Sequence, residues 1–146
     1  MKFAIEQLQL DELQDYLREQ ADDAFPDLKD EQRLTMLAGK WHKNAEFCTC
    51  RDENDQLVGM IAFYANQPAE GVVYLPHIFV SREYRGKGVF SNLFVLVKQY
   101  ARENSYSLIR LEVKKENIRA QRAYHENGFQ IDGDTNEKSI HMTYKI

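Results

Sequence analysis

The sequence predicts an α+β fold whose central mixed sheet is mostly antiparallel and is flanked by helices. Three observations predict it. Segments with strand-like and helical periodicity follow one another in the order β-α-α-β-β-β-α-β-α-β-β, which makes about seven strands and four helices. Short polar turns join the early strands, as is typical of antiparallel neighbours. A strand–helix–strand unit in the middle of the chain requires a parallel crossover.

Hydrophobic spacing defines the elements of the first half of the chain. Weak period-two alternation indicates a strand, and apolar residues three or four positions apart indicate helices. Asp11 is predicted to cap the first helix, and Pro26 marks the loop Ala24–Asp30 that follows it. The expected elements are strand Phe3–Leu8, a helix with Leu10, Leu13, Tyr16 and Leu17, a helix with Leu34, Leu37 and Trp41, and hairpin strands Glu46–Arg51 and Leu57–Tyr64.

The second half continues with a strand that proline interrupts. Val72–Val80 is expected to be this strand, and Pro76 favours a distortion because proline donates no ladder hydrogen bond. A polar connection then leads into a helix over Val89–Glu103, which is apolar on much of its circumference and should be largely buried. The remaining expected elements are strand Leu108–Val113, helix Asn117–Asn127 ended by Gly128, and strands Phe129–Ile131 and Ser139–Tyr144 around the loop Asp132–Glu137.

Length and composition favour a single domain over residues 1–146 and exclude several classes of protein. With 43% hydrophobic and 29% charged residues, the chain is neither collagen-like nor disordered. No apolar run approaches the roughly 20 residues of a membrane helix, and the N-terminus lacks a signal-peptide stretch. Two cysteines, Cys48 and Cys50, are too few for a disulfide framework and are expected to be packing residues. We therefore expect a cytoplasmic protein with no membrane partner.

Charge is distributed unevenly along the chain. Residues 1–81 carry a net charge of −8, residues 82–122 one of +6 and residues 123–146 one of −2, which sum to −4. The overall negative charge argues against general nucleic-acid binding, whereas the basic block indicates an anionic ligand at one place. Lysines and arginines on solvated helix faces would give the same sums.

The strongest local motif is the run from Val80 to Phe90, VSREYRGKGVF, between a strand and a buried helix. Gly86 and Gly88 permit unusual dihedral angles and close approach of a ligand to the backbone. Free N–H groups and the positive dipole end of the following helix would suit a phosphate. Two other interpretations are an ordinary tight turn and a dinucleotide fingerprint, which needs a third glycine where Ser91 stands.

A second motif lies in the predicted helix Asn117–Asn127. Asn117, Ala120 and Tyr124 fall on one face of that helix at about 100° per residue. An amide, a small residue and a phenol are a poor choice for core packing, and they suit a ligand that lies along the helix. The alternative is that Asn117 only caps the helix and Tyr124 is a half-buried aromatic residue.

Together the two motifs resemble those of the GNAT superfamily of N-acetyltransferases. The run Arg85-Gly86-Lys87-Gly88-Val89-Phe90 is similar to the acyl-CoA loop of the family, Gln/Arg-x-x-Gly-x-Gly/Ala, at Arg85 and Gly88. The run Asn117-x-x-Ala120-x-x-x-Tyr124-x-x-x-Gly128-Phe129 looks like its second cofactor motif. The resemblance covers residues 73–131. Phe90 departs from it, and its ring would either crowd a pyrophosphate or point into the core.

The resemblance implies that acetyl-CoA lies where the fourth and fifth strands, Val73–Val80 and Leu108–Val113, splay apart. Backbone groups of Ile78, Phe79 and Val80 would pair with the pantetheine arm, and nearby N–H groups would stabilise an oxyanion. Asn117 would contact the pantetheine or stabilise the splayed site. The amides that would wrap the pyrophosphate are those of Arg85, Gly86, Lys87, Gly88, Val89 and Phe90.

For the chemistry, the resemblance implies direct attack of an amine on the thioester, with no metal and no nucleophile from the protein. Tyr124 would protonate the leaving thiolate. His77 is a candidate general base because its ordinary pKa lies near 6.5. Several members of the family place their base at the positions of Pro76 or Tyr74, so His77 needs a bulge in the strand to share their face. Tyr74, Glu112 and a water chain are the alternatives.

The expected partners are therefore acetyl-CoA and an acceptor amine of a small molecule or peptide. The acidic N-terminal part favours a cationic acceptor such as a polyamine, an aminoglycoside, lysine or a peptide N-terminus. A non-catalytic acyl-CoA-binding sensor with the same groove is the alternative function, and a nucleotide-binding module is a third. Members of the family often form homodimers, so the resemblance leaves a homodimer open.

Overall fold

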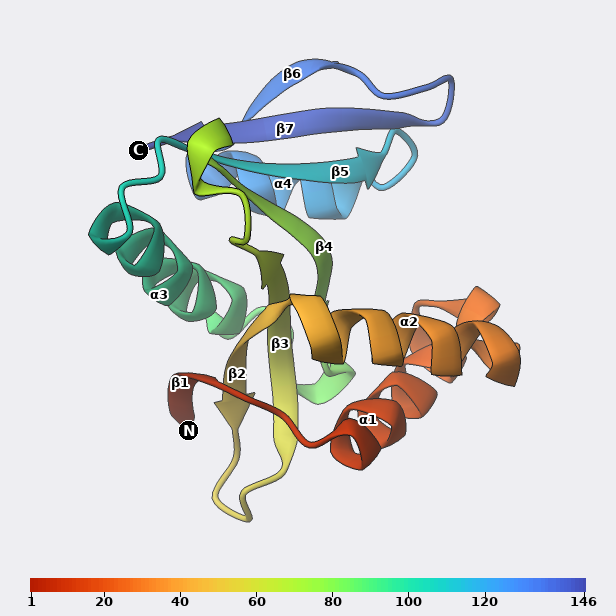
Figure 1. The fold of residues 1–146 in the computed structure, drawn as a ribbon. Coiled ribbons are helices and arrows are strands. Elements are labelled where there is room, and N and C mark those ends of the chain that lie inside the picture. Colours follow the sequence, from red (N-terminus) through yellow and green to blue (C-terminus); the bar gives the residue numbers. More distant parts are fainter.

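A seven-stranded sheet in the order β1-β2-β3-β4-β5-β7-β6 runs through the computed structural model, which describes residues 1–146 (Figure 1). The strands are β1 Lys2–Glu6, β2 Glu46–Arg51, β3 Leu57–Tyr64, β4 Val72–Val80, β5 Leu108–Lys114, β6 Gln130–Asp134 and β7 Ser139–Lys145. The helices are α1 Leu10–Asp23, α2 Glu31–Asn44, α3 Val89–Glu103 and α4 Ile118–Glu126, with short 3-10 turns η1 Pro26–Lys29, η2 Pro68–Glu70 and η3 Arg82–Tyr84. The predicted order of strands and helices is confirmed.

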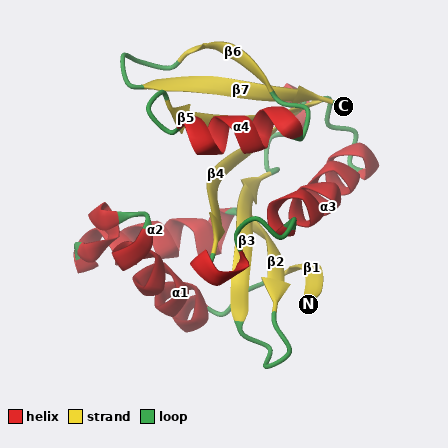
Figure 2. Ribbon diagram, turned by 180° about the vertical axis from the view of Figure 1, so that it is seen from behind, coloured by secondary structure: helices red, strands yellow, loops and turns green.

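Strand β4 is antiparallel to β3 on one edge and parallel to β5 on the other. The parallel pairing extends only over Val72–Leu75 against Leu108–Leu111. Beyond it the two strands diverge, whereas β5 stays paired with β7 along its whole length. Figures 1 and 2 show β4 and β5 running apart. The expected splay is therefore present, and it leaves one edge of β4 without a strand partner.

Strand β4 contains one extra residue around Pro76. Ala62 of β3 pairs with His77, whereas Tyr64 pairs with Tyr74, so the register shifts by one residue between the two pairs. Bulges of this kind accommodate proline, which cannot donate to a ladder. Because side chains alternate along a strand, the extra residue reverses the faces of the residues that follow it.

Each face of the sheet carries a hydrophobic core. Helices α3 and α4 cover one face, and α1 and α2 cover the other (Figures 1 and 2). Val73 and Leu75 of β4 lie in the core under α3, whereas Phe79, beyond the extra residue, lies in the core under α1 and α2. Cys48 and Cys50 are buried free thiols in the first core, as expected of packing residues.

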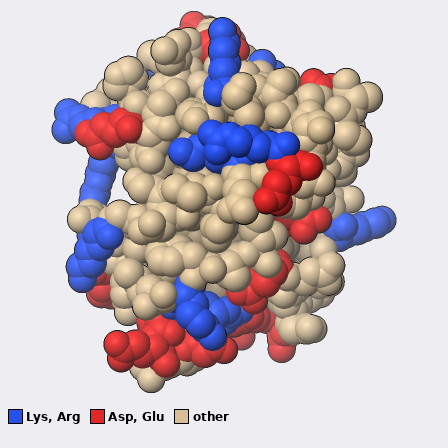
Figure 3. Space-filling model, turned by 90° about the vertical axis from the view of Figure 1, so that its left-hand side faces the viewer, with Lys and Arg blue, Asp and Glu red and all other residues tan.

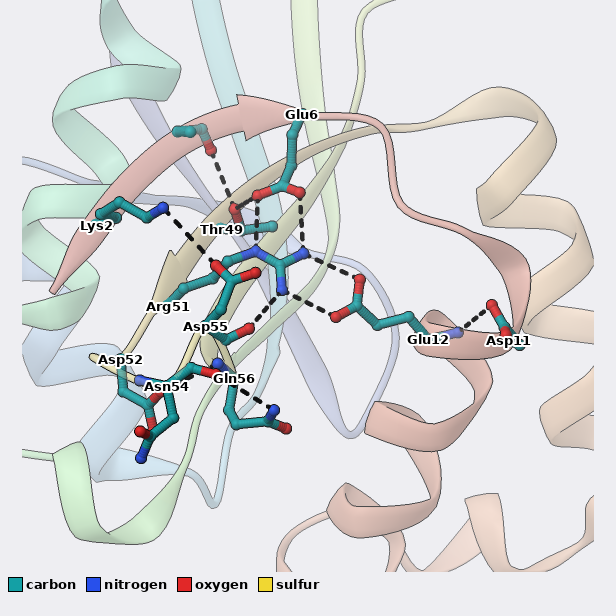
Figure 4. A network of polar contacts seen from close by, with 11 residues as sticks. Lys2, Glu6, Asp11, Glu12, Thr49, Arg51, Asp52, Asn54, Asp55 and Gln56 are labelled. Atoms are coloured by element: carbon teal, nitrogen blue, oxygen red, sulfur yellow. Dashed lines mark hydrogen bonds and ion pairs between the residues drawn. The ribbon is translucent and has the colours of Figure 1, made fainter.

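A single guanidinium joins three elements at one end of the sheet (Figure 4). Arg51 of β2 donates to both carboxylate oxygens of Glu6 on β1 and to both of Glu12 on α1, at 2.9–3.1 Å. The side chain of Arg51 is only 12% exposed. Bidentate pairs that are shielded from water are stronger than exposed ion pairs. Arg51 therefore anchors the start of α1 to the sheet.

Two boundaries at the N-terminus differ from the sequence prediction. The first strand ends at Glu6, and Leu8 leaves the sheet to enter the core under α1 and α2. Asp11 is not the cap of the first helix, because α1 begins at Leu10 with Gln9 as its cap residue. The carboxylate of Asp11 instead accepts the N–H of the following residue inside the first turn.

The C-terminal hairpin also differs from the prediction. Strand β6 extends over Gln130–Asp134 and so includes part of the predicted loop Asp132–Glu137. Its pairing with β7 is irregular between Ile131 and Asp134. Gly133 lies inside the irregularity with a φ of 91°. A glycine at positive φ lets the strand continue past a point where the sequence pattern predicts a turn.

Charged side chains of both signs are spread over the surface between uncharged residues. In Figure 3, aspartates and glutamates gather at the lower end of the molecule, where Figure 1 places the turn between β2 and β3. That turn contains Asp52, Glu53 and Asp55, which accounts for part of this negative charge. None of the four helices is long and apolar enough to cross a bilayer.

Gly59 of β3 lies directly beneath the first turn of α3. A Cβ atom at this position would lie 2.8 Å from Cγ1 of Val89 and 3.4 Å from Cδ1 of Leu93. We therefore expect Gly59→Ala to lower the free energy of unfolding by about 1–3 kcal/mol, the usual cost of overpacking. Gly39→Ala on α2 meets nothing within 4 Å and should raise it by up to about 1 kcal/mol. Urea unfolding measures both changes, and an unaltered Gly59→Ala protein would contradict the tight contact.

Candidate functional site

The opening between β4 and β5 contains a cavity of about 700 Å³. Its walls come from the second half of β4, the end of β5, the start of α4 and the segment Ala24–Asp27 after α1. A second cavity of about 390 Å³ adjoins it between the β4–α3 connection and α4. Arg85, Asn117, Ala120 and Tyr124 line both cavities. The structure thus brings the two sequence motifs together around one space.

The β4–α3 connection presents a row of free backbone donors. None of the N–H groups from Gly86 to Ser91 donates a hydrogen bond within the protein. Gly88 is the cap residue of α3 with a φ of 80°, and no side chain caps the helix. A Cβ atom would meet nothing within 4 Å at Gly86, and only Nδ2 of Asn92, at 3.9 Å, at Gly88. Unpaired donors at a helix N-terminus attract anions, and here an anion has room to approach.

The guanidinium of Arg85 is already occupied by neighbouring groups. Its Nε donates to the carbonyl oxygen of Val80 at 2.9 Å, its Nη atoms pair with Asp23, and its Cζ lies 5.4 Å from the ring centroid of Phe79. The sequence places Arg85 in the basic block that indicates an anionic ligand. The structure instead uses this side chain to hold the loop against the end of α1, while exposed Lys87 remains beside the loop.

Asp23 is an acidic partner of the turn that no sequence motif indicates. It pairs with Arg82 at 2.9 Å as well as with Arg85, 62 positions away. Burial alone would raise the pKa of this carboxyl, but the hydrogen bonds from the two arginines outweigh that effect and lower it. The β4–α3 connection is therefore fixed to α1 by an ionised carboxylate at neutral pH.

Phe90 packs against neighbouring aromatic rings and also lines the smaller cavity. Its ring is stacked on Phe94 with a centroid distance of 5.8 Å and meets the ring of Tyr124 edge-on at 5.3 Å. The side chain packs against the core under α3. Of the two expectations for this bulky residue, the structure supports the one in which the ring faces the core.

Helix α4 contributes an amide and a phenol to the cavities. Asn117 caps the helix, because its Oδ1 accepts the N–H of Ala120 at 3.1 Å. Tyr124 packs edge-on against Phe90 and Phe129, and its hydroxyl makes no hydrogen bond within the protein. Burial raises the pKa of Tyr124 to about 12, so the phenol keeps its proton at physiological pH. Capping and packing are thus real roles of these residues, and both residues also line the site.

The extra residue in β4 turns His77 toward α1 and α2. The imidazole is 6% exposed and lies between Phe25 and Trp41, with centroid distances of 4.7 and 4.8 Å. Its Nε2 is hydrogen-bonded to Oε1 of Gln20 on α1. Burial lowers the pKa of His77 to about 4 against a smaller opposite effect of Asp27, so the ring is neutral at pH 7. His77 also lines the larger cavity.

The other base candidates occupy different places. Tyr74 lines a separate pocket together with Tyr64 and Arg110, and burial raises its pKa. Glu112 lines the same cavity as His77, is exposed, and has no hydrogen-bond or ion-pair partner within the protein. No group of three or more His, Cys, Asp or Glu side chains is arranged to hold a metal ion.

Comparison with known sequences finds similarity to acetyltransferases. The model of the acetyltransferase (GNAT) family matches residues 8–129. Streptothricin acetyltransferase of Escherichia coli is 34% identical over 80 residues, which make up 55% of this chain and 45% of that enzyme. The match therefore spans less than half the length of this curated relative.

Solved structures share the fold. PaiA N-acetyltransferase of Thermoplasma acidophilum in complex with coenzyme A has a TM-score of 0.76 at 16% identity, with 100% of both chains covered. Nourseothricin acetyltransferase has a TM-score of 0.64 at 24% identity over 70% of this chain and 65% of its own. A Bacillus anthracis structure in complex with acetyl coenzyme A gives 0.63 at 26% identity, over 70% and 63% of the two chains.

The lowered pKa of His77 makes the stability of the fold depend on pH. The folded protein binds its proton at about pH 4, whereas a histidine in the unfolded chain binds it near pH 6.5. The unfolded chain therefore holds more protons between these values, and the stabilising contribution, present above pH 6.5, is lost as the pH falls toward 4. The expected loss is about 3 kcal/mol.

Denaturant unfolding of the wild type and of His77→Gln at several pH values between 7 and 4 measures this loss. The stability of the variant should decline less steeply over this range. His42→Gln, at an exposed position, is the matched control and should retain the steep decline of the wild type. Equal slopes for the wild type and His77→Gln would show that His77 is not buried in its neutral form.

Proposed function

The chain belongs to the acetyltransferase (GNAT) family, and we propose that it transfers the acetyl group of acetyl-CoA to a primary amine of a small molecule or peptide. The observation that carries this proposal is the row of unpaired N–H groups from Gly86 to Ser91, which borders the same cavity as the phenol of Tyr124. The first feature suits a diphosphate and the second suits a leaving thiolate.

Acetyl-CoA fits the residues of this site at three places. The diphosphate would accept hydrogen bonds from the N–H groups of Gly86–Ser91, and the pantetheine arm would lie along the unpaired edge of β4 near Ile78–Val80, as an added strand does. The side-chain Nδ2 of Asn117, which has no partner within the protein, would donate to the pantetheine. Relatives solved with acetyl coenzyme A and with coenzyme A support this choice of co-substrate.

In the proposed reaction, the amine attacks while both substrates are bound. A bond forms between the amine nitrogen and the thioester carbon, and the C–S bond breaks with its electron pair going to sulfur. Tyr124 gives its phenolic proton to sulfur, the nitrogen releases one proton to solvent water, and water restores the proton of the phenol. N–H groups near Ile78–Val80 would stabilise the oxyanion. His77 would accept a hydrogen bond from the amine.

The larger cavity offers one unpaired carboxylate, that of Glu112, to a cationic acceptor. Asp27 and Glu112 line this cavity, and the carboxylate of Glu112 has no partner within the protein. Arg85 and Lys114 line it too. Asp23 compensates the charge of Arg85, Arg33 compensates that of Asp27, and Lys114 has no ion-pair partner. The curated relative from Escherichia coli is a streptothricin acetyltransferase. A streptothricin therefore belongs in the first set of amines tested, beside polyamines, aminoglycosides, lysine and peptide N-termini.

A panel of amines with acetyl-CoA tests the proposal. Spermidine, kanamycin, L-lysine, a streptothricin and a short peptide are each incubated with the protein, and free thiol and the mass of the amine are followed. At least one amine should gain one acetyl group with equal release of thiol. Binding of acetyl-CoA without turnover of any amine would instead indicate an acyl-CoA sensor.

We expect Gly88→Glu to weaken the binding of acetyl-CoA at least about 100-fold. A carboxylate at this position would fill the space in front of the free donors and repel the diphosphate, and lost hydrogen bonds to a charged group are costly. Calorimetric titration measures the affinity. Gly133→Glu is the control, because Gly133 also has positive φ and open space around it but lies in β6. Unchanged binding by folded Gly88→Glu would contradict the diphosphate site.

Removal of the Tyr124 hydroxyl should lower kcat by about 10²–10⁴-fold if the phenol is the proton donor. Tyr124→Phe keeps the ring contacts with Phe90 and Phe129, so the affinity for acetyl-CoA should stay the same. Tyr144→Phe in the same aromatic cluster is the control, since Tyr144 contacts Phe129 but lines neither cavity. Steady-state kinetics with the accepted amine measure both, and an unreduced rate in Tyr124→Phe, with chemistry rate-limiting, excludes this role.

A further inference from the structure

We propose that Gln20 is a positioning residue for the transfer reaction: its amide oxygen holds His77 as the Nε2–H tautomer, so that the bare Nδ1 accepts a hydrogen bond from the acceptor amine. The inference deepens the proposed acetyl transfer and rests on it. Gln20 lies on α1, outside both sequence motifs of the site.

The contact between Gln20 and His77 joins α1 to β4 across 57 positions of the chain. Gln20 is completely buried, and His77 is 6% exposed. An amide oxygen only accepts hydrogen bonds, so the ring nitrogen that faces it must carry the proton. A neutral imidazole has one N–H, and its other nitrogen is then an acceptor. The contact therefore determines which atom of His77 is free.

The ring of His77 is held in one orientation. Phe25 and Trp41 lie on either side, with centroid distances of 4.7 and 4.8 Å. Nδ1 has no hydrogen-bond partner within the protein, and it is not sealed from solvent as Nε2 of Gln20 is. Because His77 lines the cavity between β4 and β5, the open edge of its ring borders the space where an acceptor would lie.

Packing alone does not account for this polar pair. Nε2 of Gln20 is buried without any partner, which costs free energy. The neighbouring inward-facing residues of α1, Leu13 and Leu17, are apolar and fully buried. An apolar pair at positions 20 and 77 would fill the same space without an unsatisfied group. A requirement for a fixed acceptor atom in the cavity explains why a polar pair is found there.

Charged groups around His77 act in both directions. Asp27 of η1 and Glu112 of β5 line the cavity and favour the imidazolium, whereas Arg85 and Lys114 line it and oppose this form. Burial outweighs these groups and gives a pKa of about 4. The ring therefore stays neutral, with its acceptor atom available, at any pH at which an amine reacts. Because Nδ1 is only weakly basic, it orients the amine through a hydrogen bond but does not take the proton of the amine, which goes to water.

Nitrogen-15 NMR of labelled histidine tests the tautomer without any substrate. The chain has 4 histidines, and His77→Gln identifies the signals of His77. We expect the wild type to show the Nε2–H form without titration between pH 8 and 5. Gln20→Met should give a mixture of tautomers, and Gln20→Glu should raise the pKa of His77 by about 1–3 units, because a carboxylate favours the imidazolium. An Nδ1–H form in the wild type would overturn the proposal.

The pH profile of the transfer separates positioning from a structural role. With the amine of the panel that releases most thiol, Gln20→Glu should add the protonation of His77 to the acid limb of kcat/KM, so that the limb steepens and moves upward below the pKa that NMR gives. Gln20→Met should lower kcat/KM about 10- to 100-fold at every pH, as displacement of a positioning group does. Gln32→Glu on the exposed side of α2 adds the same charge away from the cavity and should keep the wild-type profile.

The outcomes also separate this inference from the acetyl-transfer proposal. Thermal melting shows first that each variant is folded at each pH. Turnover by the wild type with an unmoved acid limb in Gln20→Glu would overturn the role of Gln20 alone. Absence of turnover with every amine, together with the expected signals of His77, would overturn acetyl transfer and with it the use of this contact in catalysis.

Discussion

The site depends on one constraint in the backbone, the extra residue that β4 accommodates at Pro76. Proline cannot take part in ladders on both edges of a strand, and β4 loses its partner β5 directly before it. The same residue reverses the faces of the strand, so that Val73 lies in the core under α3 while His77 faces α1 and α2. The open edge, the cavity and the direction of the imidazole therefore share one local cause.

Helix α1 connects this cavity with the β4–α3 turn. Tyr16, Gln20 and Asp23 lie four and three positions apart, which places them along one side of the helix. They contact, in order, Ser81 at 2.9 Å, the imidazole on β4, and the guanidinium of Arg85. At the other end of the helix, Glu12 in the first turn is bound to Arg51 of the sheet. One rigid element thus sets the distance between His77 in the cavity and the turn that carries the free N–H groups.

The sequence predicts those parts of the site that depend on neighbouring residues. Glycines before a buried helix indicate the free donors, and Asn117 and Tyr124 share a face because helical periodicity is regular. Gln20 and Asp23 were missed because each acts through a partner about sixty positions away. Their only signal in the sequence is a polar residue on the inward side of an amphipathic helix, where an apolar one is expected. The sequence does not predict the face of the sheet on which His77 lies, because that face depends on the register of β4 against β3.

Burial shifts the pKa values of Tyr124 and His77 in opposite directions, and both side chains are neutral at physiological pH. It raises the pKa of Tyr124 to about 12 and lowers that of His77 to about 4. A thiol in water has a pKa of about 8.5, so a phenol this weak would not protonate a solvated thiolate to a useful extent. A thiolate that forms inside the same cavity also loses its hydration, and this raises its proton affinity for the same reason. The difference in pKa between phenol and thiol therefore shrinks where water is excluded, so the proposed proton transfer would require the cavity to close around the thioester.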